Sequence, residues 1–105
     1  MAVALNDAVG TTLRGNVIGR AAIGLFANDG RHTMVIQNRF AASGGAIVLI
    51  DEFAASIEGN LVDEGRNFGI AISQATGRIA ITGNRLRNCG SAGAFSGGIV
   101  AMMVV

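Results

Sequence analysis

The chain has 105 residues, of which half are apolar and 14% are charged, and its formal net charge is +1. This length accommodates one domain, and the composition excludes intrinsic disorder, which requires low hydrophobicity and high net charge. The basic residues are all arginines and form no basic tract, and no apolar run approaches the ~20 residues of a membrane helix. We therefore expect neither a nucleic acid nor a membrane as a partner.

A short alternating segment at 3–5 is followed by a four-residue motif, Leu-Arg-Gly-Asn, at 13–16. The motif recurs as Val-Ile-Gln-Asn at 35–38, Ile-Glu-Gly-Asn at 57–60 and Ile-Thr-Gly-Asn at 81–84, so that the asparagines lie 22, 22 and 24 residues apart. Two positions after each asparagine comes a large apolar residue, in the set Ile18, Phe40, Val62 and Leu86. The sequence is therefore an internal repeat.

A second alternating segment lies later in each repeat, at 25–27, 47–49, 70–72 and 99–101. Apolar residues at every second position indicate β-strands rather than helices. A repeat of 22–24 residues with short strands makes one coil of a solenoid, and such coils stack about 4.8 Å apart. We predict an all-β fold, a right-handed single-stranded parallel β-helix of about four and a half coils, as a single domain over residues 1–105.

The four asparagines of the repeat are predicted to stack as a structural ladder, formed by Asn16, Asn38, Asn60 and Asn84. Their amides can donate and accept along the stack, and asparagine tolerates the left-handed backbone of a tight bend. At these positions the chain resembles the parallel β-helix repeat proteins of the pectin-lyase-like superfamily, which carry such a ladder. The resemblance implies an extracellular or surface location, but the first residues lack the pattern of a signal peptide.

Enzymes of that superfamily mostly cleave acidic polysaccharides in a groove along one strand. The outward positions of the matching strand here are all apolar: Ala4, Phe26, Val48, Ala71 and Val100. The paired-aspartate and Gly-His-Gly signatures of polygalacturonases are also missing. We therefore predict a non-catalytic structural or binding module that presents or binds carbohydrate. The alternative is a polysaccharide lyase or hydrolase, or a fragment of one, with Asp29 and Asp51 as catalytic acids.

The most regular polar feature is a set of three aspartates spaced 22 residues apart, Asp7, Asp29 and Asp51. They are predicted to stack after the second strand, and with Arg20 and Glu64 they are our candidates for ligand binding. A stack of carboxylates suits a cation or an acid pair for glycoside chemistry. The interpretation we favour is that each aspartate caps its own turn.

The remaining polar residues give no indication of a metal or a cofactor. His32 is the sole histidine and has no second His or Cys at ligand spacing, so neither zinc nor another metal site is predicted. Cys89 lies in a turn without a basic partner, which does not favour a nucleophile. Asp63 and Arg87 occupy the same repeat position on adjacent coils and are expected to form a surface ion pair.

Two apolar outer columns indicate an interface. They consist of Phe26, Val48, Ala71 and Val100 on one side, and of Met34 and Ile36 on the opposite side. Exposed strand edges and apolar patches of this kind are usually covered. We expect a homo-oligomer, or packing against other parts of a longer solenoid of which this chain is a fragment.

Overall fold

The computed structural model describes residues 1–89 and 97–102. These residues form eleven strands, and no helix that could span a membrane occurs among them. The strands are β1 (Val3–Asn6), β2 (Thr12–Arg14), β3 (Val17–Gly19), β4 (Ile23–Asn28), β5 (Arg31–Ile36), β6 (Arg39–Ile50), β7 (Phe53–Glu58), β8 (Leu61–Ser73), β9 (Thr76–Thr82), β10 (Arg85–Arg87) and β11 (Gly97–Met102).

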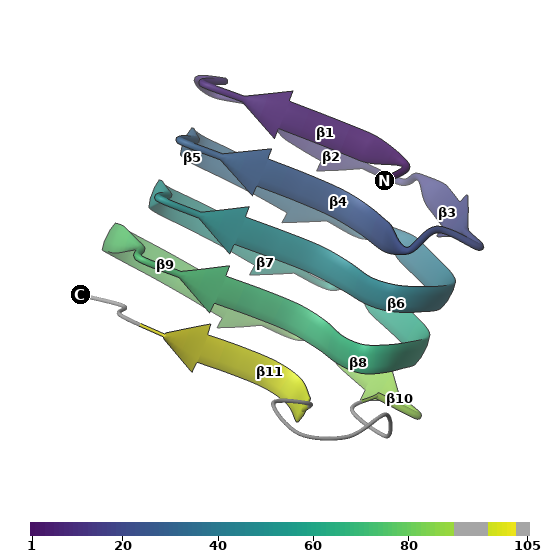
Figure 1. Cartoon of the computed structure of the whole chain (residues 1–105). Coiled ribbons are helices and arrows are strands. Elements are labelled where there is room, and N and C mark those ends of the chain that lie inside the picture. Colours follow the sequence, from purple (N-terminus) through teal and green to yellow (C-terminus); the bar gives the residue numbers. More distant parts are fainter. Residues whose placement is uncertain (90–96, 103–105) are drawn as a thin grey trace.

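The strands stack into two parallel sheets, one behind the other in Figure 1. The first sheet has the order β1-β4-β6-β8-β10, with β3 paired to β6 and β11 paired to β8, and the second has the order β2-β5-β7-β9. Successive coils therefore lie side by side, and each passes from one sheet to the other. The prediction of an all-β parallel solenoid is confirmed, with about four coils.

The repeat sets the strand register and the core. Leu25 pairs with Ile47, and Ile47 with Ile70, so the residues that share a repeat position share a column. All three side chains are fully buried, as are Phe40 and Val62 in a neighbouring column. Burying one such side chain stabilises the fold by about 1.5–3 kcal/mol as an upper estimate.

The asparagine column, formed by Asn16, Asn38, Asn60 and Asn84, is linked by side-chain hydrogen bonds. The Nδ2 atoms of Asn16, Asn38 and Asn60 each donate to the Oδ1 of the asparagine in the next coil, at 3.1, 3.1 and 2.9 Å in chain order. The same Oδ1 atoms accept the backbone N–H of the preceding asparagine at 2.8–2.9 Å. Asn60 Nδ2 also donates to the Val35 carbonyl at 2.8 Å. These bonds satisfy polar groups that the coil buries at this bend.

Left-handed backbone conformations recur at fixed places in the coils, with φ between 53° and 77°. In the described residues they form four columns: Asp7, Asp29, Asp51, Gln74; Gly10, His32, Ala54, Gly77; Gly15, Gln37, Gly59, Gly83; and Arg20, Glu64, Asn88. The expectation for Asn38 and Asn60 is a left-handed or bridging backbone, and the left-handed alternative is wrong, because neither residue has a positive φ. The residue before each asparagine turns the chain instead, which leaves the asparagine backbone N–H free to reach the next coil.

Candidate functional site

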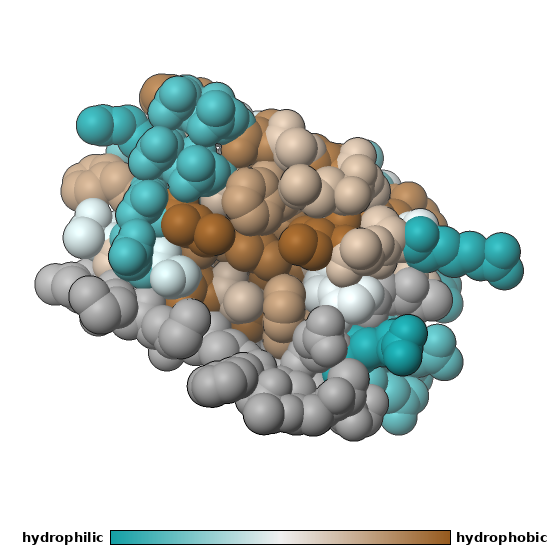
Figure 2. All heavy atoms as spheres, in the orientation of Figure 1, coloured by the Kyte–Doolittle hydropathy of each residue, from teal (hydrophilic) through white to brown (hydrophobic). Residues whose placement is uncertain are grey.

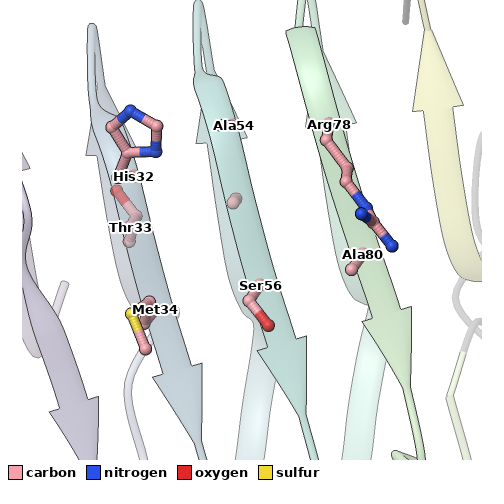
Figure 3. Close-up of a pocket in the computed structure, with 8 residues that line it drawn as sticks. His32, Thr33, Met34, Ala54, Ser56, Arg78 and Ala80 are labelled. Atoms are coloured by element: carbon pink, nitrogen blue, oxygen red, sulfur yellow. The ribbon is translucent and has the colours of Figure 1, made fainter.

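A hollow of about 510 Å³ lies over the second sheet, and we call it the β5–β7–β9 hollow (Figure 3). Its lining consists of His32, Thr33, Met34, Ala54, Ala55, Ser56, Arg78 and Ala80. The short side chains of Ala54 and Ser56 come from the middle strand, β7. The long side chains of His32 and Met34 come from β5 on one side, and Arg78 comes from β9 on the other. The hollow exists because small outward residues lie between large ones.

The backbones of β5 and β7 turn at two residues that line this hollow. His32 and Ala54 are left-handed, with φ of 58° and 61°, and the matching positions of the flanking coils are glycines. Histidine is among the residues that adopt this conformation more readily, whereas alanine is strained in it. A bulge follows on β9, because Phe53 pairs with Thr76 but Ala55 pairs with Ile79. The bulge adds Arg78 as an extra residue, and such irregularities redirect side chains.

His32 and Met34 present two donor groups at the hollow, an imidazole and a soft thioether. They are separated by one residue of β5, so their side chains emerge on the same face of the sheet (Figure 3). The His32 ring meets the Phe53 ring edge-on, with centroids 5.7 Å apart and an interplanar angle of 89°. The Met34 sulfur accepts a weak hydrogen bond from the Thr12 hydroxyl at 4.0 Å. Both donors remain exposed to solvent.

Thr33, between these donors, points inward and is completely buried. Its backbone N–H donates to Oε1 of Glu52 at 3.1 Å, and the Glu52 side chain is only 1% exposed. Glu52 Oε2 and Thr33 Oγ1 are buried and have no hydrogen-bond partner. The sequence analysis did not identify Glu52. One feature of the sequence could have identified it. Glu52 is an acidic residue at a repeat position where the adjacent coils have the small residues Gly30 and Ala75.

Asp7, Asp29 and Asp51 line a second hollow of about 370 Å³, the aspartate hollow, together with Gly30, Arg31, Phe53 and Thr76. All three are left-handed, with φ of 53–55°. Aspartate is one of the few residues that accept this conformation, which explains the residue type at this corner. Among the described residues, no hydrogen bond or ion pair to these three carboxylates is recorded.

The structure does not bring the other ligand candidates to the aspartate hollow. Arg20 and Glu64 belong to a different left-handed column, and neither lines that hollow. Close to Glu64, Asp63 accepts from Arg87 Nη2 at 3.2 Å, which is the surface ion pair expected from the repeat. In the described part of the chain, no group of three or more His, Cys, Asp or Glu residues could hold a metal ion.

The first outer column crosses the first sheet, where Phe26 pairs with Val48 and Val48 with Ala71. Figure 2 shows apolar residues gathered over the middle of this face. Val48 is only 9% exposed, whereas Phe26 and Ala71 are half-buried. The side chain of Val100 lies outside the described residues. Of the second column, Ile36 is 8% exposed and Met34 is 38% exposed, so Met34 is its accessible member.

A family model with the description "Periplasmic copper-binding protein (NosD)" matches residues 1–101. No curated protein and no solved structure is similar enough to the chain to match it.

Proposed function

The chain belongs to the NosD family of periplasmic copper-binding proteins, and from this premise we propose that it is a non-catalytic β-helix module that binds copper at the β5–β7–β9 hollow. The observation that carries the proposal is that His32 and Met34 line the same hollow. His32 forms the left-handed bend of β5 and Met34 follows it two residues later, and both side chains are on the outer face of the strand.

The donor set favours the +1 state of copper. Thioether ligands such as Met34 are soft and select Cu(I), and imidazole is a ligand for copper in general. A site for Cu(II) draws instead on several nitrogen and oxygen donors in a square-planar arrangement. In the residues that the structure describes, no cluster of three or more His, Cys, Asp or Glu side chains provides such a set. A bound copper ion would act as an exchangeable Lewis acid, and the imidazole of His32 and the sulfur of Met34 would hold it.

A binding role fits these surroundings better than a catalytic one. The hollow is open to solvent and offers two donors, so a bound ion keeps positions free for a ligand from a partner protein. The aspartates of the alternative enzyme, Asp29 and Asp51, occupy corner positions that explain their residue type without catalysis. Neither Arg20 nor Glu64 lines the aspartate hollow to assist them. We propose exchange of copper with a partner as the role of the module.

Anaerobic competition for Cu(I) between the chain and a chromophoric chelator tests this proposal. We expect one Cu(I) per chain, and an affinity that falls roughly tenfold or more in His32→Asn and in Met34→Leu, because each removes one donor. Asparagine also tolerates the left-handed backbone of residue 32. Cys89→Ser is the matched control, because it removes the thiol and leaves the hollow unchanged.

Two results would contradict the proposal. One is the absence of Cu(I) binding by the wild-type chain. The other is binding that persists unchanged in both His32→Asn and Met34→Leu. Binding of an acidic oligosaccharide in place of Cu(I) would favour the carbohydrate module predicted from the sequence.

A further inference from the structure

We infer that Glu52 is a positioning residue, which holds His32 and Met34 in place through the backbone of Thr33. The inference rests on the proposed function for its effect on copper, but the positioning itself is independent of any metal. Its basis is the 3.1 Å hydrogen bond from the Thr33 N–H to Glu52 Oε1, made in the interior of the solenoid. Thr33 is the residue between the two donors, so whatever fixes its peptide fixes both neighbours.

The left-handed turn at His32 creates the need for this contact. On either side of it the strand amides donate to the previous coil, from Arg31 to the Ala8 carbonyl at 2.9 Å and from Met34 to the Thr11 carbonyl at 2.8 Å. The Thr33 amide takes a side-chain acceptor instead. A buried N–H without a partner costs about 1–3 kcal/mol. Without Glu52, the turn at His32 would leave this amide in that state.

The packing around Glu52 indicates that its carboxyl group is there for more than stability. Its column neighbour Gly30 leaves the space that the carboxyl group fills. A Cβ on Gly30 would collide with Glu52 Oε2 and lie 2.9 Å from Thr33 Oγ1. Oε2 itself has no partner, and a buried unpaired carboxyl oxygen is costly. The next coil has Ala75 at this position, fully buried and without any polar group to satisfy.

A second contact to His32 comes from the residue next to Glu52 in the sequence. This residue, Phe53, makes the edge-on contact with the His32 ring. The turn before β7 therefore fixes His32 twice, through the backbone of Thr33 and through the ring. This arrangement gives the His32 ring one defined environment in the metal-free protein, and its NMR signals report on it.

The test measures the His32 ring signals of the metal-free chain together with Cu(I) affinity. In Glu52→Ala we expect the ring signals to move toward those of a free histidine, and the affinity to fall roughly tenfold or more. Glu52→Gln keeps an acceptor oxygen for Thr33 and should retain the wild-type signals and affinity. Gly30→Ala should behave like Glu52→Ala, because its Cβ displaces the carboxyl group. Asp51→Asn, a change of charge in the same turn, is the matched control.

Unchanged His32 ring signals in folded Glu52→Ala or folded Gly30→Ala would overturn the inference. If Glu52→Ala does not fold, the inference is tested by comparing Gly30→Ala with Glu52→Gln. Identical His32 ring signals in these two variants would also overturn it. If the wild-type chain does not bind Cu(I), the proposed function fails, yet the ring signals still show whether Glu52 positions His32. The two failures are therefore distinguishable.

Discussion

The side chain of Asn60 accepts two hydrogen bonds from Asn38, from its backbone N–H at 2.8 Å and from its Nδ2 at 3.1 Å. Both residues are almost completely buried, with exposures of 2% for Asn38 and 1% for Asn60. One side chain thus satisfies a backbone and a side-chain donor of the preceding coil. This bond pattern recurs through the asparagine column and ties each coil to the next.

Replacing Asn60 with leucine should lower the free energy of unfolding by several kcal/mol. Leucine removes the acceptor for Asn38 and the donor to the Val35 carbonyl, and each buried group left unpaired costs about 1–3 kcal/mol. Thermal or urea unfolding measures the change. Asn16→Leu is the control, because Asn16 is exposed and should lose less. Equal losses in the two variants, or no loss in Asn60→Leu, would contradict this explanation.

Much of the solenoid could be predicted from spacing alone. Residues 22 or 23 positions apart pair across coils, as Leu25 does with Ile47 and Ile47 with Ile70, because a parallel stack converts sequence period into register. The backbone conformations of the turns were harder to predict from the sequence. Glycines at positions 15 and 59 mark one left-handed column, but Gln37 in the same column carries no such mark. Stacking on neighbouring coils can impose a conformation that a residue does not prefer by itself.

Ala54 offers a test of this imposed strain. Its φ of 61° is unfavourable for a residue with a Cβ, by about 1–2 kcal/mol. Ala54→Gly should therefore raise the free energy of unfolding by about 0.5–1 kcal/mol, after the greater freedom of glycine in the unfolded chain is subtracted. Ala80→Gly is the matched control in the same hollow. Its backbone is not left-handed, so it should lose stability, and a loss in both variants would show that Ala54 is unstrained.

The aspartate hollow should respond to charge rather than bind a metal. Asp29 lies between Asp7 and Asp51, and stacked like charges repel by about 1 kcal/mol even in water. We expect Asp29→Asn to gain up to about that much in stability at low salt, and less at high salt, where the charges are screened. Asparagine tolerates the left-handed backbone as well. Unfolding curves at two salt concentrations measure the difference.

Calcium titration of the wild-type chain supplies the control for this prediction. We expect no heat of binding in the micromolar range, since no group of three or more His, Cys, Asp or Glu residues among the described residues could hold a metal ion. A micromolar isotherm that Asp29→Asn abolishes would reverse the interpretation. It would assign a cation to the hollow and favour the lyase-like alternative.

The candidate copper site was harder to foresee than the fold. By itself His32 has no partner at a His or Cys spacing, and Met34 reads as part of an apolar column. Their relationship becomes visible only when thioether sulfur is counted as a donor and the two residues are placed on one strand face. The spacing of the asparagines rises from 22 to 24 in this coil, which signals two added residues, one at Arg78 on β9 and one between Gly65 and Phe68 on β8. The role of Glu52 could not be predicted, because it depends on how residues of three coils pack together. The sequence of one repeat does not show this packing.

The last prediction concerns self-association through the first sheet. Phe26 and Ala71 remain half-buried beside Val48 on a face where apolar residues gather (Figure 2). A standard interface covers about 800 Å² per partner, which is about one seventh of the 5591 Å² that the chain exposes. We propose a dimer through this face. Because Met34 lies on the other sheet, such a dimer would leave the β5–β7–β9 hollow open to copper.

Light scattering of the wild-type chain and of Phe26→Glu tests the dimer. Phe26 is the better position for the charge, because Val48 is only 9% exposed and a glutamate there would also disturb the fold. We expect a dimer for the wild type and a monomer for Phe26→Glu, with the affinity for Cu(I) unchanged. Met34→Glu, on the opposite sheet, should remain dimeric while it loses Cu(I). A wild-type monomer at high micromolar concentration would show that the first sheet is not an interface and would make its apolar face available to a ligand.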